Sequence, residues 1–173
     1  MLAVYILLGL QGSGKTTWAK ANAKRLNAVV LSSDDIRNEM VEQGQAAEVE
    51  NGDAVFAIFN RRLAGLVRAG HNAISDATHI RRAWRQNEIE IARSLGAKVV
   101  GVWLDVPLEV CLRRNVLRPG GAWGQRAVAE DFVRELAESF EPPLVGEFDE
   151  VWKVTPPPFV VCRMGEARRG STA

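Results

Sequence analysis

The stretch GLQGSGKT at residues 9–16 determines which fold the rest of the sequence predicts. It matches G-x-x-x-x-G-K-[ST] without a gap, between the apolar run Ala3–Leu8 and a helical pattern over Lys15–Leu26, which is the context this motif requires. Glycines let the backbone curl so that successive N–H groups face one concavity, and the next helix directs its positive N-terminus at the same anion. The predicted phosphate-binding residues are Gly9, Gly12, Ser13, Gly14, Lys15, Thr16 and Thr17.

Two side chains of this loop indicate what it binds. Lys15 is a point charge that can follow the β- and γ-phosphates, and the Thr16 hydroxyl can ligate Mg²⁺. We therefore expect a nucleoside triphosphate and Mg²⁺ as ligands. The motif does not indicate what is done with the triphosphate.

Strand and helix patterns alternate along the rest of the chain. Apolar runs predict strands at Ala3–Leu8, Ala28–Leu31, Asn72–Ser75, Lys98–Leu104 and Glu150–Val154. Helical spacing predicts helices at Lys15–Leu26, Gly52–Ala69, Arg82–Leu95, Pro107–Asn115 and around residues 132–140. This alternation is typical of an α/β protein with a five-stranded parallel sheet flanked by helices. We expect one domain over residues 1–155 and a partly disordered C-terminal extension over residues 156–173.

Length and composition limit the classes of protein. The chain has 173 residues, of which 47% are hydrophobic and 25% charged, as in one globular domain. Its net charge of +1 excludes a protein that coats nucleic acid through a broad cationic face. Cys111 and Cys162 are too few for a disulfide framework, and no stretch is apolar for long enough to span a membrane. We expect a cytoplasmic protein with no membrane partner.

Phosphate loops of this kind occur in GTP switches, ATP-driven machines and kinases. A guanine-specific switch would show Asn-Lys-x-Asp, which is absent from the sequence. A hydrolytic machine commonly ends its metal-binding strand in Asp-Glu, whereas Asp76 and Asp105 are followed by Ala77 and Val106. The sequence favours a phosphotransferase.

A phosphotransferase needs a proton acceptor and basic groups that screen the transferred charge. Asp34 and Asp35 follow the second predicted strand, at the sheet edge where ligands bind, with Arg37 two residues on. Helix capping is the alternative role for Ser33 and Asp34. Arg114 and Arg118 would share a helix face if that helix continued to Arg118, and could then clamp phosphate.

These segments together resemble the phage-type polynucleotide 5′-hydroxyl kinases and neighbouring P-loop kinases of AAA type. The likeness runs from about residue 4 to 140. It depends on the order of GLQGSGKTTW (9–18), SDDIR (33–37), ISDATH (74–79), LDVP (104–107) and RRNVLR (113–118). After Asp76 this chain has Ala-Thr-His where some members of that family have Thr-Asn.

The resemblance implies a P-loop kinase fold with a helical arginine lid, and a role for each matching residue. Lys15 and Thr16 would hold ATP and its Mg²⁺, and Asp34 would be the general base on the acceptor hydroxyl. Arg37 would bind a phosphate of the acceptor. Asp76 would lie near Arg37 and the metal shell, reaching Mg²⁺ through water. Arg114 and Arg118 would be lid arginines, with Arg118 touching the transferred phosphoryl group.

The expected function is ATP-dependent phosphorylation of a 5′-hydroxyl end of DNA or RNA. The alternatives are a small-molecule kinase, whose acceptor is a metabolite, a sugar nucleotide or an antibiotic, and a nucleotide-gated binding module without transfer. Arg37, Asp34 and Asp76 are the expected acceptor-binding residues in the first case.

Other conspicuous residues are interpreted as structural. His71 and His79 are expected to be ordinary loop residues, and Arg62 to be in a buried ion pair. Trp84 is expected to pack in the core on one stripe with Ile91 and Leu95; the core interpretation also covers Trp18, Trp103 and Trp152. Trp123, in the glycine-rich segment 120–124, is the tryptophan expected to stack on a ligand.

Overall fold

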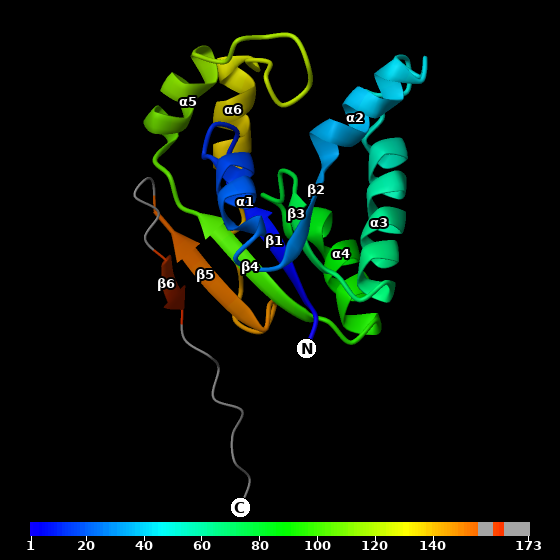
Figure 1. Cartoon of the computed structure of the whole chain (residues 1–173). Helices are drawn as coiled ribbons and strands as arrows, with labels where there is room; N and C mark the ends of the chain where they lie inside the picture. The colour runs from blue at the N-terminus through cyan, green and yellow to red at the C-terminus, as the bar shows by residue number, and fades with distance from the viewer. Residues whose placement is uncertain (156–160, 165–173) are drawn as a thin grey trace, which may run out of the picture.

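A computed structural model describes residues 1–155 and 161–164 as one six-stranded sheet with helices on both faces (Figure 1). The strand order is β2-β3-β1-β4-β5-β6. The strands are β1 (Ala3–Leu8), β2 (Ala28–Ser32), β3 (Asn72–Asp76), β4 (Lys98–Leu104), β5 (Glu150–Val154) and β6 (Val161–Met164). The first five are mutually parallel, as predicted from the alternation of strands and helices.

Strand β6 was not predicted. It lies within the expected C-terminal extension and pairs antiparallel with β5, Val151 opposite Met164 and Val154 opposite Val161. Residues Val161–Met164 therefore extend the sheet by an edge strand. The remainder of the extension, residues 156–160 and 165–173, lies outside the described residues.

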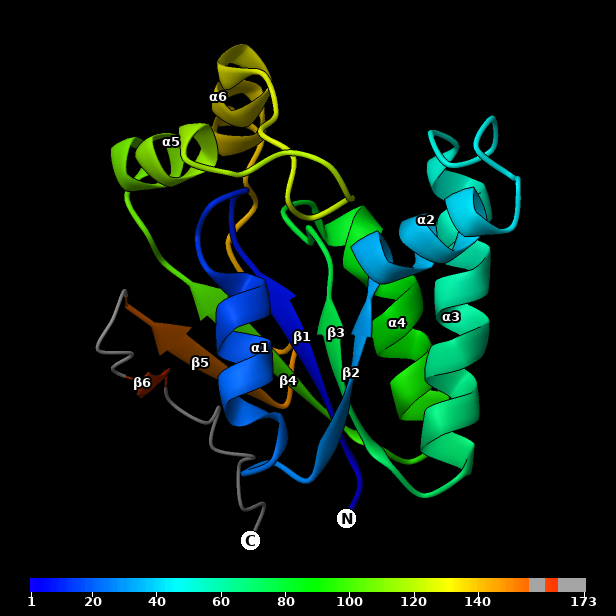
Figure 2. The same ribbon diagram turned by 45° about the horizontal axis from the view of Figure 1, so that its top comes forward.

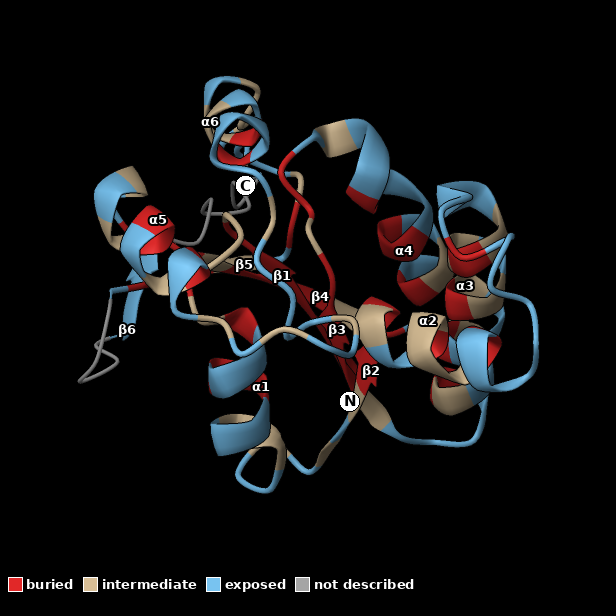
Figure 3. Ribbon diagram, turned by 90° about the horizontal axis from the view of Figure 1, so that it is seen from above, coloured by how far each residue is buried: buried red, intermediate tan, exposed pale blue. Residues whose placement is uncertain are grey.

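The helices are α1 (Lys15–Ala23), α2 (Ser33–Glu42), α3 (Gly52–Arg68), α4 (Arg82–Ser94), α5 (Leu108–Val116) and α6 (Glu130–Glu138). Alternate residues of β1 serve the two faces of the sheet, because side chains along a strand point to opposite sides. Val4, Ile6 and Leu8 pack in a cluster with residues of α2, α3 and α4. Ala3, Tyr5 and Leu7 pack in a second cluster with α1 and α5. Figure 3 shows the buried strands between α1 and α5 on one side and α2, α3 and α4 on the other. The central strand is thus buried on both sides, and its fixed position also fixes where the phosphate loop begins, at Gly9.

Helix α4 buries a face that only partly matches the one its apolar residues predict. The buried residues are Arg85, Glu88, Ile89 and Ala92, whereas Trp84 is 42% exposed. Of the predicted stripe, Ile91 and Leu95 are partly buried and pack against the core, and the prediction was wrong for Trp84. Hydrophobicity missed the correct face because two of its residues are charged and are stabilised by partners distant in sequence.

Two further expectations about single residues were wrong in part. His79 is fully buried, so it is not an ordinary loop residue. Arg62 does form an ion pair, with Glu39, but the two side chains are 40% and 43% exposed, so the pair is not buried. Arg62 reaches a partner at the protein surface, which removes any need to bury its charge.

Candidate functional site

One large cleft opens at the carboxyl ends of the parallel strands, where ligands bind in open α/β sheets. Helices α2 and α3 stand on one side of it, α5 and α6 on the other, and the phosphate loop forms its floor (Figure 2). Its volume is about 1440 Å³, above the roughly 300–1,000 Å³ of a typical single-ligand pocket. The cleft has room for a nucleotide and a second molecule.

The floor is a tight backbone loop between β1 and α1. Gly12 and Gly14 have φ of +84° and +94°, the left-handed region that favours glycine. A Cβ on Gly12 would lie 2.4 Å from the carbonyl oxygen of Cys111 at the buried face of α5. Close packing against α5 therefore adds a second requirement for glycine at this position.

Lys15 is held down onto its own loop. Its Nζ donates to the carbonyl oxygens of Gly9 and Leu10 at 2.9 Å each. Burial lowers the pKa of Lys15 to about 8, while the carboxylates of Asp76 and Asp34 act in the opposite direction. With a pKa of about 8, Lys15 is mostly protonated at pH 7, and its charge interacts with both carboxylates.

Asp76 ends β3 beside Lys15 and is 4% exposed. Its Oδ2 has no hydrogen-bond partner among the described residues. Burial raises the pKa of Asp76, and a hydrogen bond from Thr16 and the charge of Lys15 oppose that rise. A buried acceptor oxygen without a partner next to a threonine hydroxyl fits a magnesium site completed by phosphate oxygens and water.

No group of three or more His, Cys, Asp or Glu side chains that could hold a metal occurs in residues 1–155 and 161–164.

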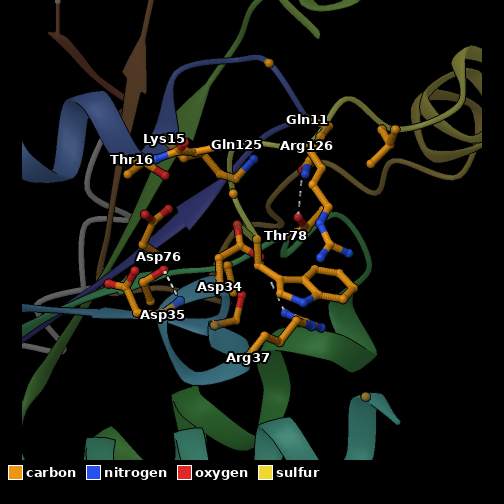
Figure 4. A pocket seen from close by; sticks show the side chains of 18 of the residues that line it. Gln11, Lys15, Thr16, Asp34, Asp35, Arg37, Asp76, Thr78, Gln125 and Arg126 are labelled. Atoms are coloured by element: carbon orange, nitrogen blue, oxygen red, sulfur yellow. Dashed lines mark hydrogen bonds and ion pairs between the residues drawn. The ribbon is translucent and has the colours of Figure 1, made fainter. Parts of the chain in front are cut away.

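Asp34 lies in the first turn of α2, facing the cleft (Figure 4). The Ser32 hydroxyl caps this helix by accepting from the backbone N–H of Asp35 at 3.3 Å. The alternative in which Ser33 or Asp34 caps the helix was therefore wrong, because Ser32 is the cap. The Asp34 carboxylate instead lies 3.6 Å from the Arg37 guanidinium.

The lid is the segment 117–129 between α5 and α6. Helix α5 ends at Val116, so Arg114 and Arg118 do not share a helix face as expected, although both line the cleft. Arg114 donates to the Gly12 carbonyl at 3.4 Å, and Arg118 to the Arg126 carbonyl at 3.2 Å. Arg114 therefore lies against the phosphate loop, and Arg118 lies against the lid.

The lid reaches across the cleft to α2. The Asn38 side chain accepts from the Trp123 N–H at 2.9 Å and donates to the Trp123 carbonyl at 3.4 Å. The Trp123 ring lies 5.3 Å from the Arg37 guanidinium and 4.8 Å from that of Arg126. A Cβ on Gly124 would come within 3.0 Å of Asp34 Oδ2. In this arrangement the lid lies against Asp34, whose side chain is still 32% exposed.

Most of the residues singled out from the sequence line this one cleft: Gly12, Gly14, Lys15, Thr16, Thr17, Asp34, Arg37, Asp76, Arg114 and Arg118. Gly9 and Ser13 lie beneath it, Gly9 as an acceptor for Lys15 and Ser13 fully buried. The sequence analysis missed Asn38, Arg126 and the contact of Gln11 with Thr78 at 3.4 Å. No sequence motif marks these contacts, and the partners of Asn38 and Gln11 lie 85 and 67 residues away.

The phosphate loop after a central parallel strand, with a lid that folds across the cleft, defines a P-loop fold of the kinase type. A family model described as an AAA domain, AAA_33, matches residues 4–143. The protein belongs to this family.

Several similar proteins are described as kinases. The L-seryl-tRNA(Sec) kinase of Methanococcus maripaludis is 25% identical over 143 residues, 80% of this chain and 52% of that protein. The chain thus spans about half the length of that curated relative. A sugar kinase from Janibacter sp. HTCC2649 has a TM-score of 0.63 at 21% identity, covering 90% of this chain and 86% of the other. The APS kinase CysC of Mycobacterium tuberculosis, solved with AMPPNP and APS, has a TM-score of 0.59 at 22% identity, covering 90% and 89%. These two structures share the fold.

The family match does not specify the acceptor, so it does not decide whether the chain is a polynucleotide 5′-hydroxyl kinase. The described part of the chain contains no helix that is long and apolar enough to cross a membrane.

Proposed function

We propose that this protein is an ATP-dependent kinase that transfers the γ-phosphate to a hydroxyl group, with Asp34 as the general base. The observation that carries the proposal is the placement of Asp34. Its carboxylate is released from helix capping by Ser32, faces the same cleft as Lys15, and lies next to Gly124 of the lid. A base that takes a proton from the acceptor has to lie within reach of the acceptor hydroxyl and the phosphates.

In the proposed reaction the acceptor hydroxyl gives its proton to Asp34 as its oxygen bonds to the γ-phosphorus. The bond from that phosphorus to the bridging oxygen breaks, and ADP leaves with the electron pair. Lys15 and the N–H groups of the loop would hold the β- and γ-phosphates. Arg114 and Arg118 would offset the negative charge that spreads over the transferred group.

Mg²⁺ would be held by Thr16 and, through water, by Asp76. It would supply charge neutralisation at the phosphate oxygens. The unpartnered Oδ2 of Asp76 supports this assignment.

The first candidate acceptor is a 5′-hydroxyl end of DNA or RNA. Arg37 supports it, as the basic side chain that α2 contributes to the cleft, and so does the neighbouring Trp123 ring, which offers an aromatic face to a base. With one or two phosphate contacts, log K against log[salt] would have a shallow slope of about −1 to −2, at roughly 0.7 per contact for a single strand.

The second candidate is a small hydroxylated molecule that is neutral or carries amines. Around Arg37 the same wall presents four carboxylates, those of Asp34, Asp35, Glu50 and Asp53. A chain of phosphates would meet net repulsion there, whereas an amine would be attracted. Phe56 and Trp84 add apolar surface to this side of the cleft.

Incubation with γ-labelled ATP, Mg²⁺ and matched acceptors tests the proposal and separates the candidates. The panel holds 5′-hydroxyl DNA and RNA oligonucleotides, nucleosides with and without a 3′-phosphate, neutral sugars and amino sugars. Asp34→Asn serves as the inactive control. Label in oligonucleotides supports the first acceptor, and label in small molecules alone supports the second. ATP binding without label in any acceptor would support the non-catalytic binding module and contradict the proposal.

Arg37→Ala sharpens the choice. For a polynucleotide acceptor, the variant should raise KM for a 3′-phosphorylated nucleoside far more than for a free nucleoside, and should flatten the salt slope. Equal losses on both acceptors would mean that Arg37 does not bind that phosphate, which removes the main support for the polynucleotide.

A further inference from the structure

A fully buried polar cluster lies beside the cleft, formed by Ser75, His79 and Glu88. Ser75 and His79 are 0% exposed and Glu88 is 1% exposed. None of them has a part in the proposed transfer. Burying a carboxylate and an imidazole in the core is costly unless both are paired and hydrogen-bonded, so the cluster calls for an explanation.

Every polar side-chain atom of the cluster has a partner. Ser75 Oγ donates to Glu88 Oε2, and His79 Nε2 lies 2.8 Å from Glu88 Oε1. His79 Nδ1 lies 2.9 Å from the Leu7 carbonyl oxygen, which can only accept, so Nδ1 carries a proton. Burial lowers the pKa of His79, but the charge and hydrogen bond of Glu88 and the Leu7 carbonyl outweigh this and leave it raised. A fully satisfied network of this kind rigidifies what it joins.

The cluster joins two strand ends that carry the site. Ser75 directly precedes Asp76, and Leu7 lies two residues before Gly9, the first glycine of the phosphate loop. The pairing of β1 with β3 runs from Val4 opposite Ala73 to Ile6 opposite Ser75. Beyond that last pair, the hydrogen bonds through Glu88 and His79 connect strand β1 to strand β3.

The Asp76 carboxylate has one direct side-chain hydrogen bond, from Thr16. Its Oδ2 has no partner among the described residues, so this oxygen is not fixed by a direct hydrogen bond. The backbone that carries it is anchored on one side by β2, where Ser32 pairs with Asp76, and on the other by Ser75 and Glu88.

We propose that Glu88 is a positioning residue, which through Ser75 and His79 fixes the carboxylate of Asp76 relative to the phosphate loop. This inference rests on the proposed function, because it assumes that Asp76 acts on the Mg²⁺ that accompanies the nucleotide. Groups that orient the immediate partners of a metal typically contribute 10–100-fold in metal affinity or activity.

Glu88→Gln and Glu88→Ala separate positioning from charge. The glutamine keeps every bond, because its oxygen can accept from Ser75 and its amide can donate to a neutral His79 Nε2. The alanine removes both connections. Calorimetric titration of each variant with ATP, with and without Mg²⁺, measures the metal-dependent gain in affinity without any acceptor. Steady-state transfer, where an acceptor is known, adds the separation of kcat from KM.

For Glu88→Ala we expect binding of ATP alone to be unchanged and the Mg²⁺-dependent gain to fall about 10–100-fold, with kcat falling in parallel. Glu88→Gln should restore both to within a few-fold of the wild type. Glu90→Ala, on the exposed face of the same helix, is the matched control and should change neither.

An alanine variant with the full Mg²⁺-dependent gain would overturn the proposal, as would a glutamine variant as impaired as the alanine one. If Glu88→Ala does not fold, Ser75→Ala decides, since it removes only the bond next to Asp76: a smaller loss in the same direction supports the proposal, and no loss refutes it. Because the titration needs no acceptor, a failure of the transfer assay leaves this test intact.

Discussion

The floor of the cleft and its roof are built in different ways. The floor is eight consecutive residues whose backbone forms the cradle, and Lys15 is bound by the carbonyls of Gly9 and Leu10 from the same loop. The roof forms only when Trp123 of the lid meets Asn38 and Arg37 of α2, segments about 85 residues apart. The floor should therefore withstand changes elsewhere in the chain, whereas the roof should open when one contact is lost. The following five changes test this difference.

Lys15→Ala should have the largest effect on activity. It removes the buried cation that faces the β- and γ-phosphates, so transfer should fall by at least about 10³-fold. Rates of transfer measured at saturating acceptor check this. Activity within tenfold of the wild type would mean that the floor is not the phosphate site.

Asp34→Asn should lower kcat by about 10²–10⁴-fold, the usual contribution of a general base, and leave ATP binding nearly unchanged. The amide keeps the shape of the side chain but cannot take the proton. Asp35→Asn, one residue further along α2, is the matched control and should lower kcat much less. A reversed order of the two variants would move the base to Asp35.

Gly12→Ala should destabilise the floor by about 1–3 kcal/mol, because the new Cβ would overlap the backbone of Cys111. Gly120→Ala is the comparison: φ is also positive there, at +85°, but nothing lies within 4 Å of the added Cβ. Thermal melting of both variants separates the clash from the backbone strain. Equal losses would show that α5 yields to the added methyl group.

Asn38→Ala should loosen the roof without affecting the floor. It removes both hydrogen bonds to Trp123, each contributing about 0.5–1.5 kcal/mol. We expect roughly a tenfold rise in acceptor KM and more ATP hydrolysis without acceptor, as water reaches Asp34. Asn38→Asp, which keeps the acceptor for the Trp123 N–H, should lie in between. Unchanged values in both variants would mean that the hydrogen bonds between Asn38 and Trp123 do not control the position of the lid.

The pH dependence of ATP binding should follow the titration of Lys15 in the floor of the cleft and not depend on the contacts of the lid. Below pH 8 the Lys15 ammonium is charged and affinity should be constant. As pH rises through its lowered pKa of about 8, the free protein loses that proton and affinity should fall by up to tenfold per pH unit. Titrations at pH 7, 8 and 9 measure this. An affinity that does not change up to pH 9 would place the pKa of Lys15 well above 8.

Local patterns were enough for most of the elements, but not for all of them or for every face. The parallel strands were predicted within a residue of their ends, because short apolar runs bounded by polar residues are typical of buried strands. Helix α2 was not predicted, although Ser33 and Asp34 were considered as helix caps. On α4 the prediction was wrong for Trp84, and it missed Arg85 and Glu88, which are buried against Glu147 and His79, partners that hydrophobic spacing cannot reveal. Strand β6 was missed because a four-residue edge strand has too little pattern of its own.

The sequence by itself determined the phosphate loop, the order of the strands along the chain, the carboxylates that follow β2 and the carboxylate that ends β3. These features depend on consecutive residues whose backbone preferences act locally. Only the tertiary structure decided that Ser32 and not Asp34 caps α2, that Trp123 closes onto Asn38, and that Glu88 connects β1 to β3. The reason is physical: whether a polar side chain is free or engaged depends on which atoms the fold brings within hydrogen-bond distance, and sequence patterns do not give those distances, whether the partner is three residues away, as for Ser32, or 85, as for Asn38.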